Sequence, residues 1–181
     1  GVYIENYQSP LLFIDIGEKS DKELLSSLQA FESSLLMIGM GRWTNSVISI
    51  GHAIELVAQS RFEHAVGFVE AIDEFCLKHC ISDELKSAAH ETRKKRNQYI
   101  HRSTIPKDNE DAIFTYMKKS LGVLTVFLEK EFSFDLYGSI FVKPLSRNLK
   151  IAKNIAKAQS GDLPAGYSMS ILVKTITNTI H

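Results

Sequence analysis

The sequence predicts an all-α protein: an up-and-down helical bundle with a short extended N-terminal arm and a C-terminal helical appendage. Apolar residues recur every three or four positions in five segments between residues 21 and 132, which is the spacing of one helix face. Gly, Pro and capping residues separate these segments into helices joined by short loops, a pattern typical of bundles. With 181 residues, 44% of them hydrophobic, the chain is long enough to bury one sizeable core.

Five helices are expected in the bundle. The apolar stripes place them at about 21–40, 43–60, 63–79, 83–101 and 110–132. Ser20 and Glu23 have the spacing of a capping box at the start of the first helix. Ser82 or Asp83 is expected to cap the fourth helix, and Pro106 breaks the chain before the fifth.

The chain divides into three parts. They are an extended arm over residues 1–20, the bundle over 21–135 and an extension over 136–181. The arm is rich in β-branched and aromatic residues, so it is either extended or forms one or two short strands. In the extension, Tyr137–Val142 is a candidate strand and residues 145–159 form a basic amphipathic helix. That helix either follows RNA phosphates, lies on an acidic membrane or docks on the acidic half of the chain.

The net charge of zero conceals an asymmetry along the chain. Residues 1–80 carry 11 acidic and 5 basic side chains, a balance of −6. Residues 81–181 carry 10 acidic and 16 basic side chains, a balance of +6. The basic half is either a surface for a polyanion such as nucleic acid or one side of a well-solvated, dipolar protein.

The sequence has no feature of a membrane or secreted protein. The longest apolar runs, such as Leu121–Leu128, are too short to span a bilayer, and no N-terminal stretch has the form of a signal peptide. The two cysteines, Cys76 and Cys80, lie four positions apart and do not form a disulfide framework. We therefore expect a cytoplasmic protein without a membrane partner.

An Arg-Asn-x-x-x-His pattern at Arg96, Asn97 and His101 is the most informative feature of the sequence. It lies in residues 93–102, RKKRNQYIHR, the densest cationic stretch of the chain. Arginine binds phosphate and histidine exchanges protons near neutral pH, so together they suit chemistry on a phosphodiester. Asn97 and His101 share a helix face, and the long side chain of Arg96 is expected to reach a shared phosphate. The alternative is a solvated basic face with His101 as a charge partner at the helix end.

This pattern resembles the R-[N/D/H]-x-x-x-H signature of the HEPN superfamily, the higher eukaryote and prokaryote nucleotide-binding domains. The resemblance covers about residues 21–132 and includes the place of the motif, at the end of the penultimate long helix of a bundle. It implies a metal-independent endoribonuclease without a cofactor, in which Arg96, Asn97 and His101 are catalytic. It also implies a homodimer whose two motifs line one cleft and cleave RNA to 2′,3′-cyclic phosphate and 5′-OH ends.

The resemblance also implies partners and a biological setting. The neighbouring cations are expected to bind RNA phosphates; they are Arg93, Lys94, Lys95 and Arg102. Defence, stress response or a toxin–antitoxin system is the implied setting, with an antitoxin or a fused domain as a further partner. HEPN toxins paired with nucleotidyltransferase antitoxins tend to carry a tyrosine two residues after the histidine. Here that position is Ser103, so we do not expect regulation by adenylylation of such a tyrosine.

Glu55 is an acidic residue among small and apolar neighbours on the second helix. It either supports the site by orienting Arg96 or His101, or it forms an interfacial salt bridge. Because Arg96 and His101 belong to a charged helix end, we expect both to be exposed. Replacing either should then change the free energy of unfolding by less than about 1 kcal/mol.

Neither a metal site nor a single function follows from the remaining residues. Cys76, His79 and Cys80 gather at one helix end, but zinc sites need four ligands and no second cluster supplies the rest, so no metal is expected.

Two other functions stay open beside ribonuclease activity. One is a HEPN-like module that binds RNA, a nucleotide or a partner protein without cleavage, and the other is a structural dimerisation domain of a larger protein.

Overall fold

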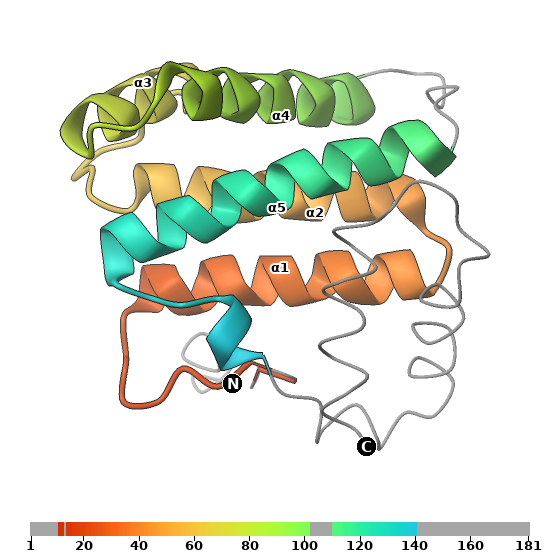
Figure 1. The fold of residues 1–181 in the computed structure, drawn as a ribbon, viewed down its shortest axis with the longest axis horizontal. Coiled ribbons are helices and arrows are strands. Elements are labelled where there is room, and N and C mark those ends of the chain that lie inside the picture. The colour runs from red at the N-terminus through yellow and green to blue at the C-terminus, as the bar shows by residue number, and fades with distance from the viewer. Residues whose placement is uncertain (1–10, 13, 102–109, 141–181) are drawn as a thin grey trace, which may run out of the picture.

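Helices form all of the regular structure in residues 11–12, 14–101 and 110–140, which the computed structural model describes (Figure 1). They are α1 (Lys22–Gly39), α2 (Trp43–Gln59), α3 (Phe68–Lys78), α4 (Asp83–His101) and α5 (Glu110–Phe132), followed by a 3-10 turn, η1 (Tyr137–Ser139). The predicted all-α class is confirmed for these residues, which contain no strand. No helix among them is long and apolar enough to cross a membrane.

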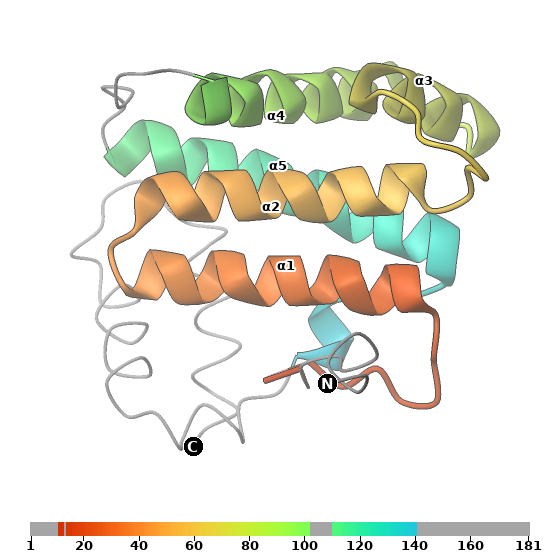
Figure 2. The same ribbon diagram turned by 180° about the vertical axis from the view of Figure 1, so that it is seen from behind.

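α2 is the central helix of the bundle, because it contacts each of the other four helices. α1 runs antiparallel beside it, and α5 lies across one of its faces, as Figures 1 and 2 show from opposite sides. α3 and α4 lie on the side of α2 that is away from α1. The C-terminal end of α4 and the N-terminal ends of α2 and α5 lie at the same end of the bundle.

The apolar stripe of α2 explains its central place. Val47, Ile50, Ile54 and Val57 recur at helical spacing and are all fully buried. Burying each of these aliphatic side chains stabilises the fold by about 1.5–3 kcal/mol. Replacing Ile54 with Asp would place an unpaired charge in this core, and we expect that change to unfold the bundle.

α3 is shorter than predicted, because it begins at Phe68 and not near residue 63. Gly67 precedes it with extended backbone, at a ψ of 154°, and glycine is a poor helix former. The side-chain amide of Gln59 donates a hydrogen bond to the carbonyl of Val66 over 2.8 Å. This bond holds the chain between α2 and α3 as a loop.

The two predicted helix caps have different outcomes. The capping box at Ser20 is wrong, because the N-cap of α1 is Asp21, which makes no side-chain cap hydrogen bond. The cap of α4 is confirmed, since Ser82 Oγ accepts a hydrogen bond from the backbone N–H of Leu85 over 3.2 Å. This bond satisfies one of the N–H groups that a helix start leaves without a partner.

The buried core continues beyond α5. Phe134, Leu136 and Ile140 are buried in the same cluster as Ile14, which precedes α1. The candidate strand at Tyr137–Val142 is wrong over its first residues, because they form η1 and Ile140 makes only an isolated antiparallel bridge to Ile14. The buried bridge therefore places the segment before α1 next to the segment after α5.

Several predicted features lie outside the described residues. They are Arg102, Ser103, the break at Pro106, residues 1–10 of the arm, and residues 141–181, which include the basic helix at 145–159.

Candidate functional site

The three motif residues are divided between the inner and the outer side of α4. Thr92 and Tyr99 are buried and mark the side of α4 that faces the bundle. Successive helical residues are rotated by about 100°, so Arg96 belongs to this inward side. His101 is rotated by about 140° from Arg96 and is exposed at the last residue of the helix. Asn97 lies on the same outer side as His101 and is half-buried.

Arg96 is held between α4, α2 and α3. Its Nη1 donates a hydrogen bond to Oε2 of Glu55 over 3.1 Å, and both side chains are only 17% exposed. The guanidinium carbon lies 5.5 Å from the ring centroid of Phe68, a distance suited to cation–π attraction. Among the described residues, its buried Nε has no hydrogen-bond acceptor.

The expectation that Arg96 is exposed is wrong. Its aliphatic stem crosses α2 at Gly51, where a Cβ atom would lie 2.9 Å from Arg96 Cβ and Cγ. Only glycine leaves room for this approach, so the side chain turns inward and reaches Glu55. The many charged residues around Arg96 in the sequence predicted a solvated helix end, but packing of α2 against α4 sets the position of its side chain.

Glu55 also faces His52, one turn earlier on α2. Nδ1 of His52 lies 3.4 Å from Oε1 of Glu55, and the imidazole is 48% exposed. The hydrogen bond with His52 lowers the pKa of Glu55, and the positive charge of Arg96 lowers it further, against the opposing effect of burial. One alternative from the sequence was that Glu55 orients Arg96, and the structure brings these two side chains together. The sequence did not include His52 in this cluster, although His52 and Glu55 are three positions apart on one helix.

The cations that were predicted to bind phosphate have different surroundings. Lys94 is exposed, whereas Arg93 and Lys95 are half-buried. Nζ of Lys95 lies 5.9 Å from the ring centroid of Tyr99. Nε of Arg93 donates to Nδ1 of His90 over a long distance of 3.4 Å. Lys94 is therefore the most accessible of the three to a phosphate group.

A shallow groove between α3 and α4 adjoins these cations. Arg93 and Lys94 line it together with Asp73 and Glu91, so its charge is mixed. Nε2 of His90 lies 2.8 Å from Oδ1 of Asp73, and this hydrogen bond lowers the pKa of Asp73. The acidic residues reduce the attraction of the groove for a polyanion.

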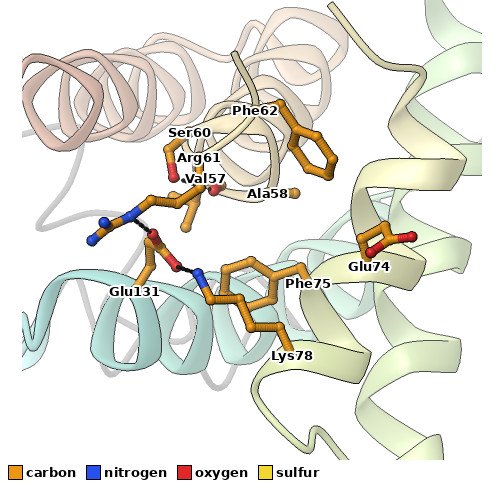
Figure 3. A pocket seen from close by; sticks show the side chains of 9 residues that line it. All are labelled: Val57, Ala58, Ser60, Arg61, Phe62, Glu74, Phe75, Lys78 and Glu131. Atoms are coloured by element: carbon orange, nitrogen blue, oxygen red, sulfur yellow. Dashed lines mark hydrogen bonds and ion pairs between the residues drawn. The ribbon is translucent and has the colours of Figure 1, made fainter. Parts of the chain in front are cut away.

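A cavity of about 220 Å³ lies at the opposite end of the bundle from His101, where α2 and α5 end (Figure 3). The carboxylate of Glu131 is buried there and forms an ion pair with Arg61. Nε2 of His79 lies 2.8 Å from the same carboxylate, and Nζ of Lys78 lies 4.0 Å from it. Lys78 and His79 lie at the C-terminal end of α3, where positive charge offsets the partial negative charge of the helix end. We interpret this ion-pair network as a structural link that holds α2, α3 and α5 together.

Cys76, His79 and Cys80 are the residues that gather at one helix end in the sequence. No group of three His, Cys, Asp or Glu side chains within the described residues is placed to hold a metal ion. Cys76 is buried and Cys80 is exposed. Burial raises the pKa of the Cys76 thiol to about 11, which disfavours the thiolate form that binds metals.

Comparison with protein families, curated proteins and solved structures finds no match to this chain. A function for this chain is therefore inferred from the motif and from the geometry around α2 and α4.

Proposed function

We propose that this chain is a HEPN-like, metal-independent endoribonuclease that acts as a homodimer. The observation that carries the proposal is the arrangement on α4. Arg96 is held by the carboxylate of Glu55, and His101 is exposed at the end of the same helix. The all-helical bundle, with the motif at the end of its penultimate long helix, agrees with the architecture that the resemblance implies.

A dimer supplies what a single chain lacks at this site. Because Arg96 and His101 lie on different sides of α4, they do not converge on one phosphate within a chain. Cleavage of RNA needs a base for the 2′-hydroxyl, an acid for the departing 5′-oxygen and cations for the phosphorane. Two-fold pairing, the commonest oligomeric arrangement, brings two copies of each group to one cleft.

The proposed reaction follows from these groups. The 2′-oxygen attacks phosphorus while one His101 takes its proton, and the P–O5′ bond breaks as the other His101 protonates the 5′-oxygen. Arg96 stabilises the charge on the phosphorane, and Asn97 holds a phosphate oxygen by hydrogen bonding. Lys94 and the other cations of α4 bind flanking phosphates. The products are a 2′,3′-cyclic phosphate and a 5′-OH, and defence, stress response or a toxin–antitoxin system in the cytoplasm is the proposed setting.

The test is cleavage of an oligoribonucleotide in excess EDTA by the full chain. We expect His101→Ala to lower the cleavage rate by at least about 100-fold, because it removes proton transfer. His64→Ala is the matched control, since His64 is exposed in the loop between α2 and α3 and lies outside the site. A substrate with a single 2′-deoxy position at the cleavage site should resist cleavage. Full activity of His101→Ala, or a strict requirement for Mg²⁺, would refute the mechanism.

A second candidate function is RNA binding without cleavage. The burial of Arg96 favours it, because an arginine that pairs with Glu55 and packs on Gly51 has a sufficient structural reason to be there. Under this function the wild-type protein binds RNA but leaves it intact. Binding weakens with added salt and survives His101→Ala. An electrophoretic mobility assay beside the cleavage assay distinguishes the two functions.

A further inference from the structure

We infer that His52 is a further catalytic residue of this site, as the base that takes the proton of the attacking 2′-hydroxyl. The Arg-Asn-x-x-x-His motif does not contain this residue. The inference rests on the proposed ribonuclease function and changes how its acid and base are assigned.

His52 lies next to the group that would bind the phosphate. The two oxygens of Glu55 face two different groups: Oε2 accepts a hydrogen bond from Arg96 Nη1 over 3.1 Å, and Oε1 lies 3.4 Å from His52 Nδ1. His52 and Arg96 therefore lie on either side of one carboxylate, although they belong to α2 and α4. His101 is rotated by about 140° around α4 from Arg96. Within one chain, the histidine beside the phosphate-binding arginine is thus His52.

Glu55 also orients the imidazole ring of His52. A carboxylate that faces Nδ1 holds the proton of the neutral ring on that nitrogen and leaves Nε2 as the proton acceptor. Among the described residues, the structure pairs His52 with the charged group of Glu55 on its own helix, and Glu55 in turn pairs with Arg96 of α4. The lowered pKa of Glu55 keeps its carboxylate charged at neutral pH, so the orienting contact persists there.

The imidazole is accessible, whereas its partners are sheltered. The side chain of His52 is 48% exposed, and those of Glu55 and Arg96 are each 17% exposed. A substrate therefore reaches the imidazole from solvent while the carboxylate behind it stays protected. A base needs this combination, because it must contact the 2′-hydroxyl and also be held in one orientation.

The reaction then uses His52 of one copy as the base and His101 of a second copy as the acid. The 2′-oxygen forms a bond to phosphorus as its proton passes to Nε2 of His52. The P–O5′ bond breaks, and the 5′-oxygen takes a proton from the imidazolium of His101 of a second copy. Arg96 stabilises the negative charge on the phosphorane. A later proton exchange with water restores both histidines.

The experiment measures cleavage of the same oligoribonucleotide in EDTA by His52→Ala and His52→Gln. Glutamine keeps a donor for Glu55 but accepts no proton, so it separates orientation from proton transfer. We expect both variants to lower kcat by about 100-fold or more, with KM and Tm close to those of the wild type. The pH–rate profile should lose the limb that belongs to the base, and added imidazole should restore part of the His52→Ala rate. His64→Ala should behave as the wild type.

Three other results would contradict the catalytic role of His52. Full kcat in His52→Ala, with His101→Ala inactive, overturns the role of His52 and leaves the proposed ribonuclease in place. A lower kcat that accompanies a lower Tm, without rescue by imidazole, assigns His52 a structural role. Absence of cleavage by the wild-type protein refutes the ribonuclease function, and the role of His52 falls with it.

Discussion

At the scale of single residues, Arg96 links stability to the proposed chemistry. Its charge pairs with Glu55 in a partly buried setting, and its stem packs against Gly51. A long cationic side chain often combines these two roles, because its methylene groups bury apolar surface while its head finds a polar partner. Variants of Arg96 therefore need a stability measurement beside any activity measurement.

Arg96→Ala should lower the free energy of unfolding by about 1–3 kcal/mol, because it removes packing on α2 and leaves the Glu55 charge without its arginine. Urea unfolding followed by circular dichroism measures this change. His101→Ala is the control, and its effect should stay within about 0.5 kcal/mol because the side chain is exposed. Equal stability of both variants would contradict the position of Arg96 described above.

Glu55 should make stability depend on pH in the acidic range. Its pKa in the folded protein is lowered from the ordinary value of 4.5, mainly by the hydrogen bond with His52. The carboxylate thus stabilises the fold above that ordinary value, and this contribution is lost as the pH falls through the folded pKa. Glu55→Gln should show a weaker loss of stability between neutral and acidic pH than the wild type. Parallel pH profiles from thermal unfolding of the two proteins would count against the pairing.

At the scale of elements, the contact between α2 and α4 forms the candidate site. A single glycine sets how closely these helices approach, since a Cβ at Gly51 would lie 2.9 Å from two carbons of Arg96. The approach places Glu55 of α2 within reach of Arg96 on α4. Helix packing, and not any property of α4 by itself, therefore assembles the cluster.

Gly51→Ala should destabilise the bundle by about 1–3 kcal/mol, because the added methyl group forces Arg96 and α4 to move. Gly122→Ala is the matched control. Gly122 is exposed within α5 and has no atom within 4 Å of an added Cβ. Alanine at that position should stabilise the helix by about 0.5–1 kcal/mol. Chemical unfolding of both variants should give opposite signs, and a neutral Gly51→Ala would show that the helices do not pack this closely.

At the scale of the whole molecule, the proposed reaction requires two copies of the chain. The outer side of α4 carries His101, Asn97 and Lys94, while Arg96 faces the bundle. A site that needs both sides of this helix is incomplete in one copy. Assembly is thus a condition for activity under the proposed function.

We expect light scattering at micromolar concentration to give the mass of a dimer, and the specific rate of RNA cleavage to fall on dilution below the dimer dissociation constant. The His64→Ala protein serves as the control for both measurements. A monomer with full cleavage activity would contradict the two-copy site.

Periodicity along the chain predicted the five helices and most of the buried residues of their stripes, whereas Ala65, expected to face inward, is exposed in the loop before α3. The bounds of α4 and α5 agree with prediction, and Val47, Ile50 and Ile54 lie in the core as expected. Periodicity is a local property, because side chains three or four positions apart share a helix face whatever the helix packs against. The loop before α3 was missed, although Gly67 is a local signal for the later start of that helix, and the bond from Gln59 to Val66 across the loop could not be read from the sequence.

Which side chains from different helices meet depends on tertiary packing, so the sequence offered a contact between Glu55 and Arg96 only as one of two alternatives. Arg96 and Glu55 are 41 positions apart, and Arg61 and Glu131 are 70 positions apart. No spacing rule relates such residues, because their contact depends on how whole helices cross and on the room that Gly51 leaves between two of them. The motif relates Arg96 to His101 by spacing along one helix, whereas packing of α2 against α4 brings Arg96 to Glu55, the residue that also contacts His52.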